Sequence, residues 1–445
     1  MRTRVGIAGA GAAATAIAAR LVDRLDDVAI HCFDSWRLGS SLAFSTTGVG
    51  TTCNTSTAAN SGYLSALGGA PRDPAVTPMS PSRDFVGRDV IGHAVAATAQ
   101  RLRDRHRGEL HEALGPVVSI RRDGRSLTVE SEGSRVDGLR AMFLCRGLTE
   151  PTVPPELLDT LAGLGIDSDR IIPSPYPLDT RLRDVHDQRV LVIGSGLSAV
   201  EAALALAECG CRVTIASRSG RLPSVRATLP DDPELARWFS SRIRAEVPCN
   251  PEHMTRLLFS WFAELGYPLP DGAPTRSLAR EIDECTAPRH WAVPIVPLCR
   301  AVNALPRFRT VSRAALEAFP FRRHTNALNL PSALRLNHHM MRGAIDVARL
   351  GDVIGPSEQF GPRRTRLRDI DTTVLACGWQ TQPAPWADAS IPTTSSVDAV
   401  WYPEPHIVRI GVEAHADIAV PNALFALDQQ LADLDAGRHR NRLGA

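Results

Sequence analysis

Two glycine-rich turns, about 185 residues apart, constrain this chain more than any other feature of its sequence. Residues 5–14 read VGIAGAGAAA and residues 190–199 read VLVIGSGLSA, so each is a short apolar strand, a G-x-G-x-x-A turn and the start of a helix. This order of elements seats the pyrophosphate of a dinucleotide on a helix N-terminus. The sequence therefore predicts an α/β protein with two Rossmann-like (βαβ) dinucleotide-binding domains, which would pass electrons between two different dinucleotides.

Each turn has three positions with separate tasks. The first glycine permits a tight turn, the second lets the backbone approach the pyrophosphate closely, and the third, small residue lets helix and strand pack together. Alanine is an accepted residue at the third position. We predict that the six residues at these positions bind the two cofactors: Gly9, Gly11, Ala14, Gly194, Gly196 and Ala199.

The strand that follows each helix indicates which dinucleotide binds there. Residues 28–34 end in Asp34, whose carboxylate can accept hydrogen bonds from ribose hydroxyls and would repel a 2′-phosphate. Residues 211–218 end in Ser217 and Arg218, which suit a 2′-phosphate. We therefore predict FAD at the first site and NADPH at the second. The cofactor-binding residues predicted at and beyond the strand ends are Asp34, Ser35, Trp36, Ser217, Arg218, Arg221 and Gly378.

Two simpler interpretations of the turns remain open. Residues 1–4 include two arginines and precede an apolar stretch, as in a secretory signal peptide. The turn glycines and Asp34 argue against this interpretation. Residues 194–196 could also be an ordinary strand-to-helix turn, although Arg218 stands at the offset expected of a phosphate-binding residue.

Composition argues against several other classes of protein. The formal net charge is +2, so bulk charge gives no reason to expect nucleic acid or an anionic membrane as a partner. No apolar stretch approaches the roughly 20 residues that a membrane span needs, and we expect a cytoplasmic protein. The nine cysteines include no C-x-x-C pair, which argues against a disulfide framework, a zinc ribbon and the dithiol flavoprotein reductases. The chain contains no lysine, so anion binding must rely on arginine.

The order of strand-like and helix-like stretches divides the chain into five parts. We expect residues 1–180 and 381–445 to form one discontinuous FAD-binding domain, whose parallel sheet is reached by crossover connections. Residues 181–230 would begin the NADPH-binding domain, and residues 341–380 would return to it and supply a linker strand. Residues 231–340 are charged and helical in pattern, and we interpret them as a helical insertion near the substrate.

Within these parts, three local elements are predicted. A long helix runs from Arg88 to about Arg107. A hairpin turns at Asp123-Gly124 between residues 117–120 and 126–131. A closing helix is expected at about residues 421–436.

Six stretches of the sequence together resemble one group of proteins. The stretches are residues 9–11 with Asp34, 42–45 leading to Asn54, 85–88, 194–201, 217–223 and 375–379. The chain resembles the two-dinucleotide-binding flavoproteins that include the class B flavin monooxygenases. Within them it is similar to a bacterial FAD/NAD(P)-binding family related to the ornithine and lysine N-hydroxylases and the aspartate N-monooxygenases. The chain departs from the pattern at Gly411-Val412, where many of these flavoproteins carry Gly-Asp, and it lacks the lysine that ornithine hydroxylases place near the substrate carboxylate.

The resemblance implies a flavin monooxygenase. NADPH would reduce FAD by hydride transfer, and the reduced flavin would react with O2 to give a C4a-hydroperoxide that passes one oxygen to a nucleophile. The implied substrate is a small metabolite, and N-hydroxylation of an amino acid or amine is the favoured reaction. A flavin reductase or dehydrogenase without oxygen insertion stays open as an alternative, as does a non-enzymatic module that keeps FAD structurally. The sequence leaves a homo-oligomer open.

Four residues are candidates for catalysis. Asn54 could bond the flavin or a peroxide oxygen, or it could be a turn-forming asparagine. Arg88 could bind a carboxylate or a phosphate, or it could be a surface arginine. Asn326 and Asn329 could line the nicotinamide or substrate pocket.

No metal site is expected. His338 and His339 are adjacent and would point to different sides of a helix, with no spaced carboxylate or cysteine beside them. Cys53 could be a redox thiol beside the flavin, but its neighbours Thr52 and Asn54 supply no cation that would stabilise a thiolate.

Overall fold

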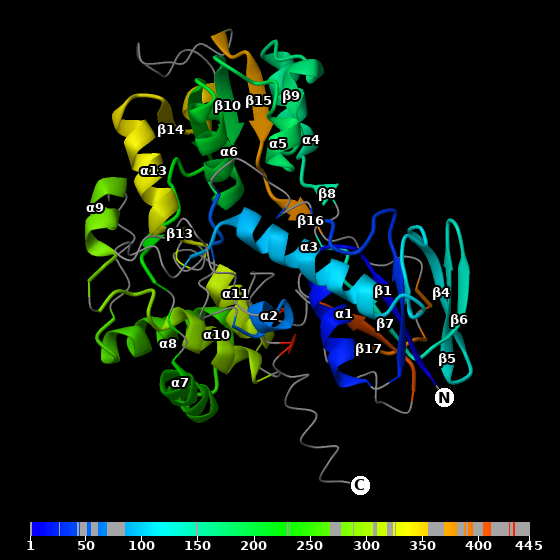
Figure 1. Ribbon diagram of the computed structural model, residues 1–445. Coiled ribbons are helices and arrows are strands. Elements are labelled where there is room, and N and C mark those ends of the chain that lie inside the picture. The colour runs from blue at the N-terminus through cyan, green and yellow to red at the C-terminus, as the bar shows by residue number, and fades with distance from the viewer. Residues whose placement is uncertain are drawn as a thin grey trace.

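The computed structural model has three parts: a first-sheet module at the lower right of Figure 1, a second-sheet module at the top, and a helical insertion at the lower left. The structure describes residues 2–25, 27–41, 44, 51–54, 61–68, 85–147, 150–228, 230, 232–267, 277–287, 289–305, 309–317, 324, 326–354, 369–380, 387–388, 390–394, 404–410, 427 and 430–431.

The first sheet is parallel throughout, with the strand order β17-β18-β7-β1-β2-β3. Strands from both ends of the sequence meet in it, because β18 pairs with β7 and β7 pairs with β1. The strands are β1 (Thr3–Ala8), β2 (Val28–Phe33), β3 (Leu110–His111), β7 (Ala141–Leu144), β17 (Thr393–Thr394) and β18 (His406–Arg409).

Helices cover one face of the first sheet and an antiparallel meander covers the other. Successive side chains of β2 point to opposite faces of the sheet, and this explains both layers. The core on the helix side contains Val28, Ile30 and Cys32, whereas the core under the meander contains Phe33. The helices are α1 (Ala12–Arg24), α2 (Ser61–Ala66) and α3 (Arg88–Arg105), and the meander strands are β4 (Val117–Asp123), β5 (Ser126–Ser131) and β6 (Arg135–Leu139).

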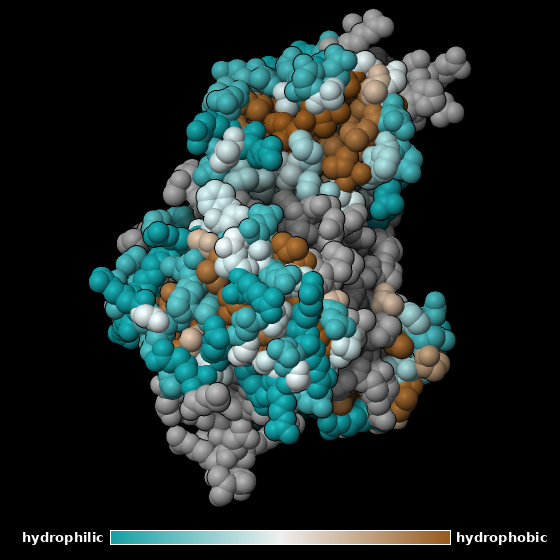
Figure 2. Space-filling view, turned by 90° about the vertical axis from the view of Figure 1, so that its right-hand side faces the viewer, coloured by the Kyte–Doolittle hydropathy of each residue, from teal (hydrophilic) through white to brown (hydrophobic). Residues whose placement is uncertain are grey.

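The second sheet is also parallel, with the strand order β14-β11-β10-β15-β9. Its strands are β9 (Ile171–Ile172), β10 (Arg189–Ile193), β11 (Arg212–Ser217), β14 (Ile345–Arg349) and β15 (Thr372–Leu375). One face packs on α5 (Leu178–Arg181), α6 (Leu197–Glu208), α9 (Leu278–Glu284) and α13 (Leu330–Met341), and the other on α4 (Pro155–Gly163) and α14 (Leu350–Ile354). A short 3-10 helix (Ser168–Arg170) precedes β9. Figure 2 shows apolar residues gathered on this module.

The helical insertion has its own apolar core. Trp261 and Trp291 are buried in it and Trp238 packs against it, so these tryptophans are core residues. Phe85, from the segment that precedes α3, belongs to the same core. The helices that build the insertion are α7 (Pro233–Ala245), α8 (Pro251–Glu264), α10 (Ile295–Asn303) and α11 (Arg309–Glu317).

Two short ladders mark the places where the chain passes between parts. β8 (Glu150–Pro151) and β16 (Trp379–Gln380) pair antiparallel, so the outward and the return connection between the two sheets run side by side. β12 (Val225–Arg226) and β13 (Leu328–Asn329) pair in parallel. They lie just before and just after the helices of the insertion, so the insertion leaves and rejoins the rest of the chain through this ladder.

The α/β class with two Rossmann-like units is confirmed, as are the hairpin at Asp123-Gly124 and the helix that begins at Arg88. That helix ends at Arg105, close to the expected end. The five domain boundaries stay predictions; α9 and α13, which we expected in the insertion, pack with the second sheet. Residues 42–43, 45, 411–413 and most of the predicted closing helix lie outside the described residues.

His31 makes the stability of the first-sheet module depend on pH. Its ring is buried, stacks on His111 with ring centroids 4.5 Å apart, and its Nε2 has no hydrogen-bond partner among the described residues. Burial, then His111 and Arg4, lower the pKa of His31 from 6.5 to about 4. Between these values the unfolded chain binds a proton at this ring and the folded chain does not, so acidification favours unfolding.

We expect the free energy of unfolding to fall by about 2 kcal/mol through this ring as the pH is lowered from about 6.5 to about 4. The variant His31→Phe keeps the stacked ring and removes the titration. Urea unfolding at several pH values should therefore show a smaller acid dependence for the variant than for the unmodified protein. Equal acid dependence of the two proteins would contradict this assignment.

Candidate functional site

The first glycine turn joins β1 to α1, and its geometry fits a pyrophosphate. Gly9 has a φ of +115°, and a Cβ built there would lie 2.4 Å from the carbonyl oxygen of Cys145, so this position requires glycine. Gly11 is the N-cap residue of α1, which has no side-chain cap hydrogen bond, and Ala14 is fully buried below it. A helix N-terminus without a side-chain cap offers its N–H groups to an anion.

Asp34 follows β2 and lies beside this turn. Its Oδ1 accepts a hydrogen bond from the backbone N–H of Trp36 at 3.0 Å. Burial raises the pKa of the carboxyl, and the backbone N–H groups of Trp36, Ser35 and Ala10 oppose that rise. Ser35 is exposed, and Trp36 is 68% exposed. The structure thus brings Asp34 to the turn and leaves Ser35 and Trp36 at the surface.

The second glycine turn repeats the arrangement between β10 and α6. Gly194 has a φ of +127°, and a Cβ there would lie 2.3 Å from the carbonyl oxygen of Ala376. Gly196 is the N-cap residue of α6, again without a side-chain cap, and Ala199 is fully buried. A Cβ at Gly196 would meet nothing within 4 Å, so open space lies in front of this residue.

Residues predicted to hold the adenosine phosphate gather at the same edge of the second sheet. Ser217 ends β11, and its Oγ accepts the backbone N–H of Gly220 at 3.1 Å. Arg218 is exposed and close enough to Cys377 to oppose the rise in thiol pKa that burial causes. Arg221 is half-buried, and Gly378 follows β15 with a φ of +109°.

Two segments that we call the strap, residues 51–54 and 85–88, lie where the three parts of the molecule meet. Thr52 and Gly87 form an antiparallel bridge. The backbone N–H of Cys53 donates to the carbonyl oxygen of Val86 at 2.8 Å, and that of Arg88 donates to the carbonyl oxygen of Thr51 at 2.9 Å. The strap therefore fixes Asn54 and Arg88 relative to each other, although they lie far apart in the sequence.

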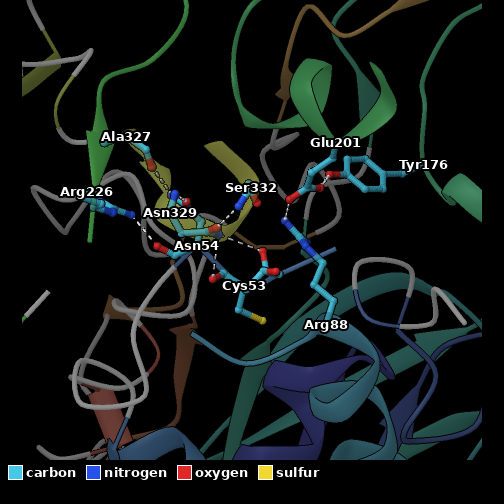
Figure 3. Close-up of polar contacts among 10 residues, drawn as sticks. Cys53, Asn54, Arg88, Tyr176, Glu201, Arg226, Ala327, Asn329 and Ser332 are labelled. Atoms are coloured by element: carbon cyan, nitrogen blue, oxygen red, sulfur yellow. Dashed lines mark hydrogen bonds and ion pairs between the residues drawn. The ribbon is translucent and has the colours of Figure 1, made fainter. Parts of the chain in front are cut away.

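Asn54 holds the strap to the ladder at the base of the insertion (Figure 3). Its Nδ2 donates to the carbonyl oxygen of Ala327 at 2.7 Å, and its Oδ1 accepts the backbone N–H of Asn329 at 3.0 Å. Arg226 Nη2 donates to the carbonyl oxygen of Asn54 at 2.5 Å. All of these groups are buried, and burial lowers the pKa of Arg226 to about 9.

Asn329 completes this clamp from the other side. Its Nδ2 donates to the carbonyl oxygen of Cys53 at 3.3 Å, while its Oδ1 caps α13 by accepting the backbone N–H of Ser332 at 2.8 Å. Asn326 is half-buried and has no side-chain hydrogen bond in the described part of the chain. The structure thus brings together Asn54 and Asn329, each with protein partners, and it gives the Asn326 side chain no hydrogen bond to them among the described residues.

Arg88 forms a buried ion pair with the second-sheet module. Its Nη2 lies 2.7 Å from Glu201 Oε1, and the Tyr176 hydroxyl donates a short hydrogen bond to Glu201 Oε2 (Figure 3). Burial alone would lower the pKa of Arg88, but the interactions with Glu201, Tyr176 and Cys53 together outweigh burial and raise that pKa. The interpretation of Arg88 as a surface arginine is therefore wrong, because its side chain is 15% exposed and bound to a carboxylate.

The described cysteines and histidines form neither a disulfide nor a metal centre. All nine thiols are free, and no group of three potential ligands lies together among the described residues. Burial raises the pKa of Cys53 to about 12, even though Arg88 opposes the shift. His338 and His339 lie in the last turn of α13. No described helix is long and apolar enough to cross a membrane.

Sequence reasoning missed three members of this junction: Tyr176, Glu201 and Arg226. Glu201 carried a signal, since it is the acid in the middle of a helix, LSAVEAALALAE, whose other residues are apolar except Ser198 and Glu208, and it would face a core without a cationic partner. Tyr176 and Arg226 gave no such signal in the sequence. Tyr176 is a single aromatic residue in a Pro-rich segment, and Arg226 is one of several arginines in its segment.

The fold and the two turns define a two-dinucleotide-binding flavoprotein. Residues 3–246, more than half of the chain, match the family described as pyridine nucleotide-disulphide oxidoreductase. The chain belongs to this family, and it is an oxidoreductase.

Solved structures are similar at low sequence identity. OTEMO in complex with FAD and NADP shares 14% identity, with 98% of this chain and 84% of that chain covered and a TM-score of 0.50. A mutant flavin monooxygenase from Stenotrophomonas maltophilia shares 12% identity over the full length of both chains, with a TM-score of 0.47. The bacillithiol disulfide reductase Bdr from Staphylococcus aureus shares 16% identity over 55% of this chain and 65% of that chain, with a TM-score of 0.33. The search of curated proteins gave no match.

Proposed function

We propose that this protein is an NADPH-dependent FAD monooxygenase that N-hydroxylates an amino acid or another small amine. The observation that carries the proposal is the pair of glycine turns, each on its own parallel sheet and each ending in an uncapped helix N-terminus. Two such turns in one molecule can hold a flavin dinucleotide and the nicotinamide dinucleotide that reduces it.

The residues present fit the two cofactors. The turn at Gly9 with Asp34 beside it would hold the adenosine half of FAD, as the backbone N–H groups of α1 suit its pyrophosphate. The open space before Gly196 would admit the pyrophosphate of NADPH, and exposed Arg218 would reach a 2′-phosphate. When bound, FAD supplies the redox chemistry, accepting a hydride from NADPH and passing electrons to O2.

The chain's own residues would exclude water and hold the partners at the junction. Cys53 and Phe85 in the strap are buried, as is Phe44 against Arg88, so the groups there are shielded from solvent. An amine substrate must lose its proton before its nitrogen can attack, and a dry surrounding lowers the pKa of an ammonium group.

Buried thiols argue against disulfide reduction as the reaction. Cys53 has a pKa of about 12, and burial likewise raises the pKa of Cys32 well above its usual value. Both thiols therefore stay protonated near neutral pH and are poor nucleophiles. For this reason we favour oxygen transfer over the dithiol chemistry that gives the family its name.

A stopped-flow experiment distinguishes the proposal from a reductase. Protein reconstituted with FAD is reduced with NADPH without oxygen and then mixed with O2. We expect a transient absorbance, distinct from the reduced and the oxidised flavin, that decays faster when the amine substrate is present. Direct return to the oxidised spectrum would favour a reductase or dehydrogenase. Screening NADPH oxidation against amino acids and simple amines would then identify the substrate.

Removal of the Arg218 charge tests the choice of NADPH over NADH. We expect Arg218→Ala to raise the KM for NADPH by about 10-fold or more, the effect of losing one charge-assisted hydrogen bond, and to leave the KM for NADH nearly unchanged. Arg212→Ala is the control, since Arg212 is an exposed arginine at the opposite end of β11. Equal changes for both nucleotides would contradict a 2′-phosphate site at Arg218.

A further inference from the structure

The contact of Arg88 with Glu201 and Tyr176 joins three distant segments. Arg88 is the first residue of α3, Glu201 lies in the second turn of α6, and Tyr176 precedes α5. Arg88 and Glu201 are 113 residues apart in sequence. Figure 3 shows all three side chains pointing toward one another across the junction. This contact thus joins the strap of the first-sheet module to α6, the helix of the second-sheet module whose N-terminus follows the second glycine turn.

Each partner is itself held in place. The backbone N–H of Arg88 is bonded to Thr51 within the strap, and the strap is clamped to the insertion through Asn54. The guanidinium also lies 5.9 Å from the ring centroids of Phe44 and Tyr176. Both carboxylate oxygens of Glu201 are engaged, one by Arg88 and one by Tyr176. The contact therefore defines one relative position of the two helices.

Glu201 lies close to the second glycine turn, at the N-terminus of α6. It is five residues from Gly196, which is about 7.5 Å along the helix axis. A shift of Glu201 would therefore carry the N-terminus of α6 and the nucleotide bound there. The exposed fractions of the two side chains are 15% for Arg88 and 7% for Glu201. A pair this buried adds little net stability over an apolar pair, but it imposes a specific geometry.

We propose that Glu201 and Tyr176 are positioning residues: through Arg88 they fix the NADPH-binding helix α6 against the FAD-binding module, and so set the rate of hydride transfer and not the affinity for NADPH. This inference rests on the proposed function. Hydride transfer needs donor and acceptor atoms about 3–3.5 Å apart, and a misplacement of about 1 Å costs roughly 100-fold in rate. The residues that would contact the phosphates of the nucleotide lie within the second-sheet module and would not depend on this alignment.

Anaerobic reduction of the FAD-loaded protein by NADPH separates rate from affinity. For Glu201→Gln we expect the limiting rate of flavin reduction to fall by about 10-fold to 100-fold, with the half-saturating NADPH concentration unchanged within about 3-fold. Glu201→Asp keeps the charge and should recover part of the rate. Glu208→Gln is the matched control, because Glu208 lies on the same helix and pairs with Arg335 within the second-sheet module. It should behave like the unmodified protein.

Hydrogen exchange of the nucleotide-free protein gives a second readout. In Glu201→Gln the amides of residues 85–92 should exchange faster, because the strap loses its anchor on α6, whereas Glu208→Gln should leave them unchanged. If Glu201→Gln does not fold, Tyr176→Phe removes one hydroxyl and should give the same changes at smaller size. An unchanged limiting rate, or an effect confined to NADPH affinity, would overturn the proposal. If the unmodified protein is not reduced by NADPH at all, the proposed function fails instead, and unchanged exchange at residues 85–92 would then reject the anchor itself.

Discussion

We expect Gly196→Ala to fold normally, to bind FAD normally and to lose most of its affinity for NADPH. The added Cβ meets no protein atom within 4 Å and the residue does not require a positive φ, so the protein accommodates the methyl group without strain. The space it fills is where the backbone must approach the pyrophosphate. Steric conflict of this kind costs about 2 kcal/mol, which corresponds to about a 30-fold rise in the dissociation constant.

Gly194→Ala is the informative contrast. Its Cβ would lie 2.3 Å from the carbonyl oxygen of Ala376, at a φ of +127°, so this variant should lose stability before any ligand is added. NADPH titration of flavin reduction, with thermal unfolding measured on the same samples, separates the two effects. A Gly196→Ala variant with unaltered NADPH affinity would show that the nucleotide does not lie against this turn.

We expect Asn54→Ala to loosen the helical insertion strongly. The substitution leaves the buried carbonyl of Ala327 and the buried N–H of Asn329 without the side chain that bonds them. Each orphaned group costs about 1–3 kcal/mol, so the free energy of unfolding should fall by about 3 kcal/mol. Urea unfolding followed by tryptophan fluorescence is a suitable measurement, because Trp238, Trp261 and Trp291 report on the insertion.

Asn326→Ala is the matched control for the clamp. Asn326 is the same residue type in the same segment, but it is half-buried and has no hydrogen bond from its side chain in the described structure. Its removal should change stability by less than about 0.5 kcal/mol. If Asn54→Ala is as mild as this control, the clamp does not hold the insertion and Asn54 is free for the role of a flavin ligand.

The two nucleotide turns could be predicted from sequence because their physical requirements are local. A glycine with a positive φ, a small residue beneath the helix and an acid or arginine after the next strand all lie within about 30 residues of one another. The parallel order of both sheets follows from these units, since crossover connections place their strands side by side.

The partners of Asn54 and Arg88 could not be predicted in this way. Asn54 bonds a backbone group 275 residues further along, and Arg88 bonds a carboxylate 113 residues further along. Nothing in the local sequence around either residue encodes such a contact, which depends on how the three parts of the molecule pack together. The sequence predicts both residues as ligand-binding because of their side-chain chemistry. Ligand binding by Asn54 and Arg88 stays a prediction. In the structure both side chains also bond protein groups, so a ligand would have to bind beside these partners.

The uptake and reduction of flavin test the central claim most directly. Purified protein is incubated with FAD, freed of unbound flavin, and titrated with NADPH in the absence of oxygen while the visible spectrum is recorded. If the two glycine turns hold FAD and NADPH, the protein will be yellow, with roughly one FAD per chain, and will be bleached by a stoichiometric amount of NADPH. A colourless protein that retains no FAD, or a bound flavin that NADPH never reduces, would contradict it.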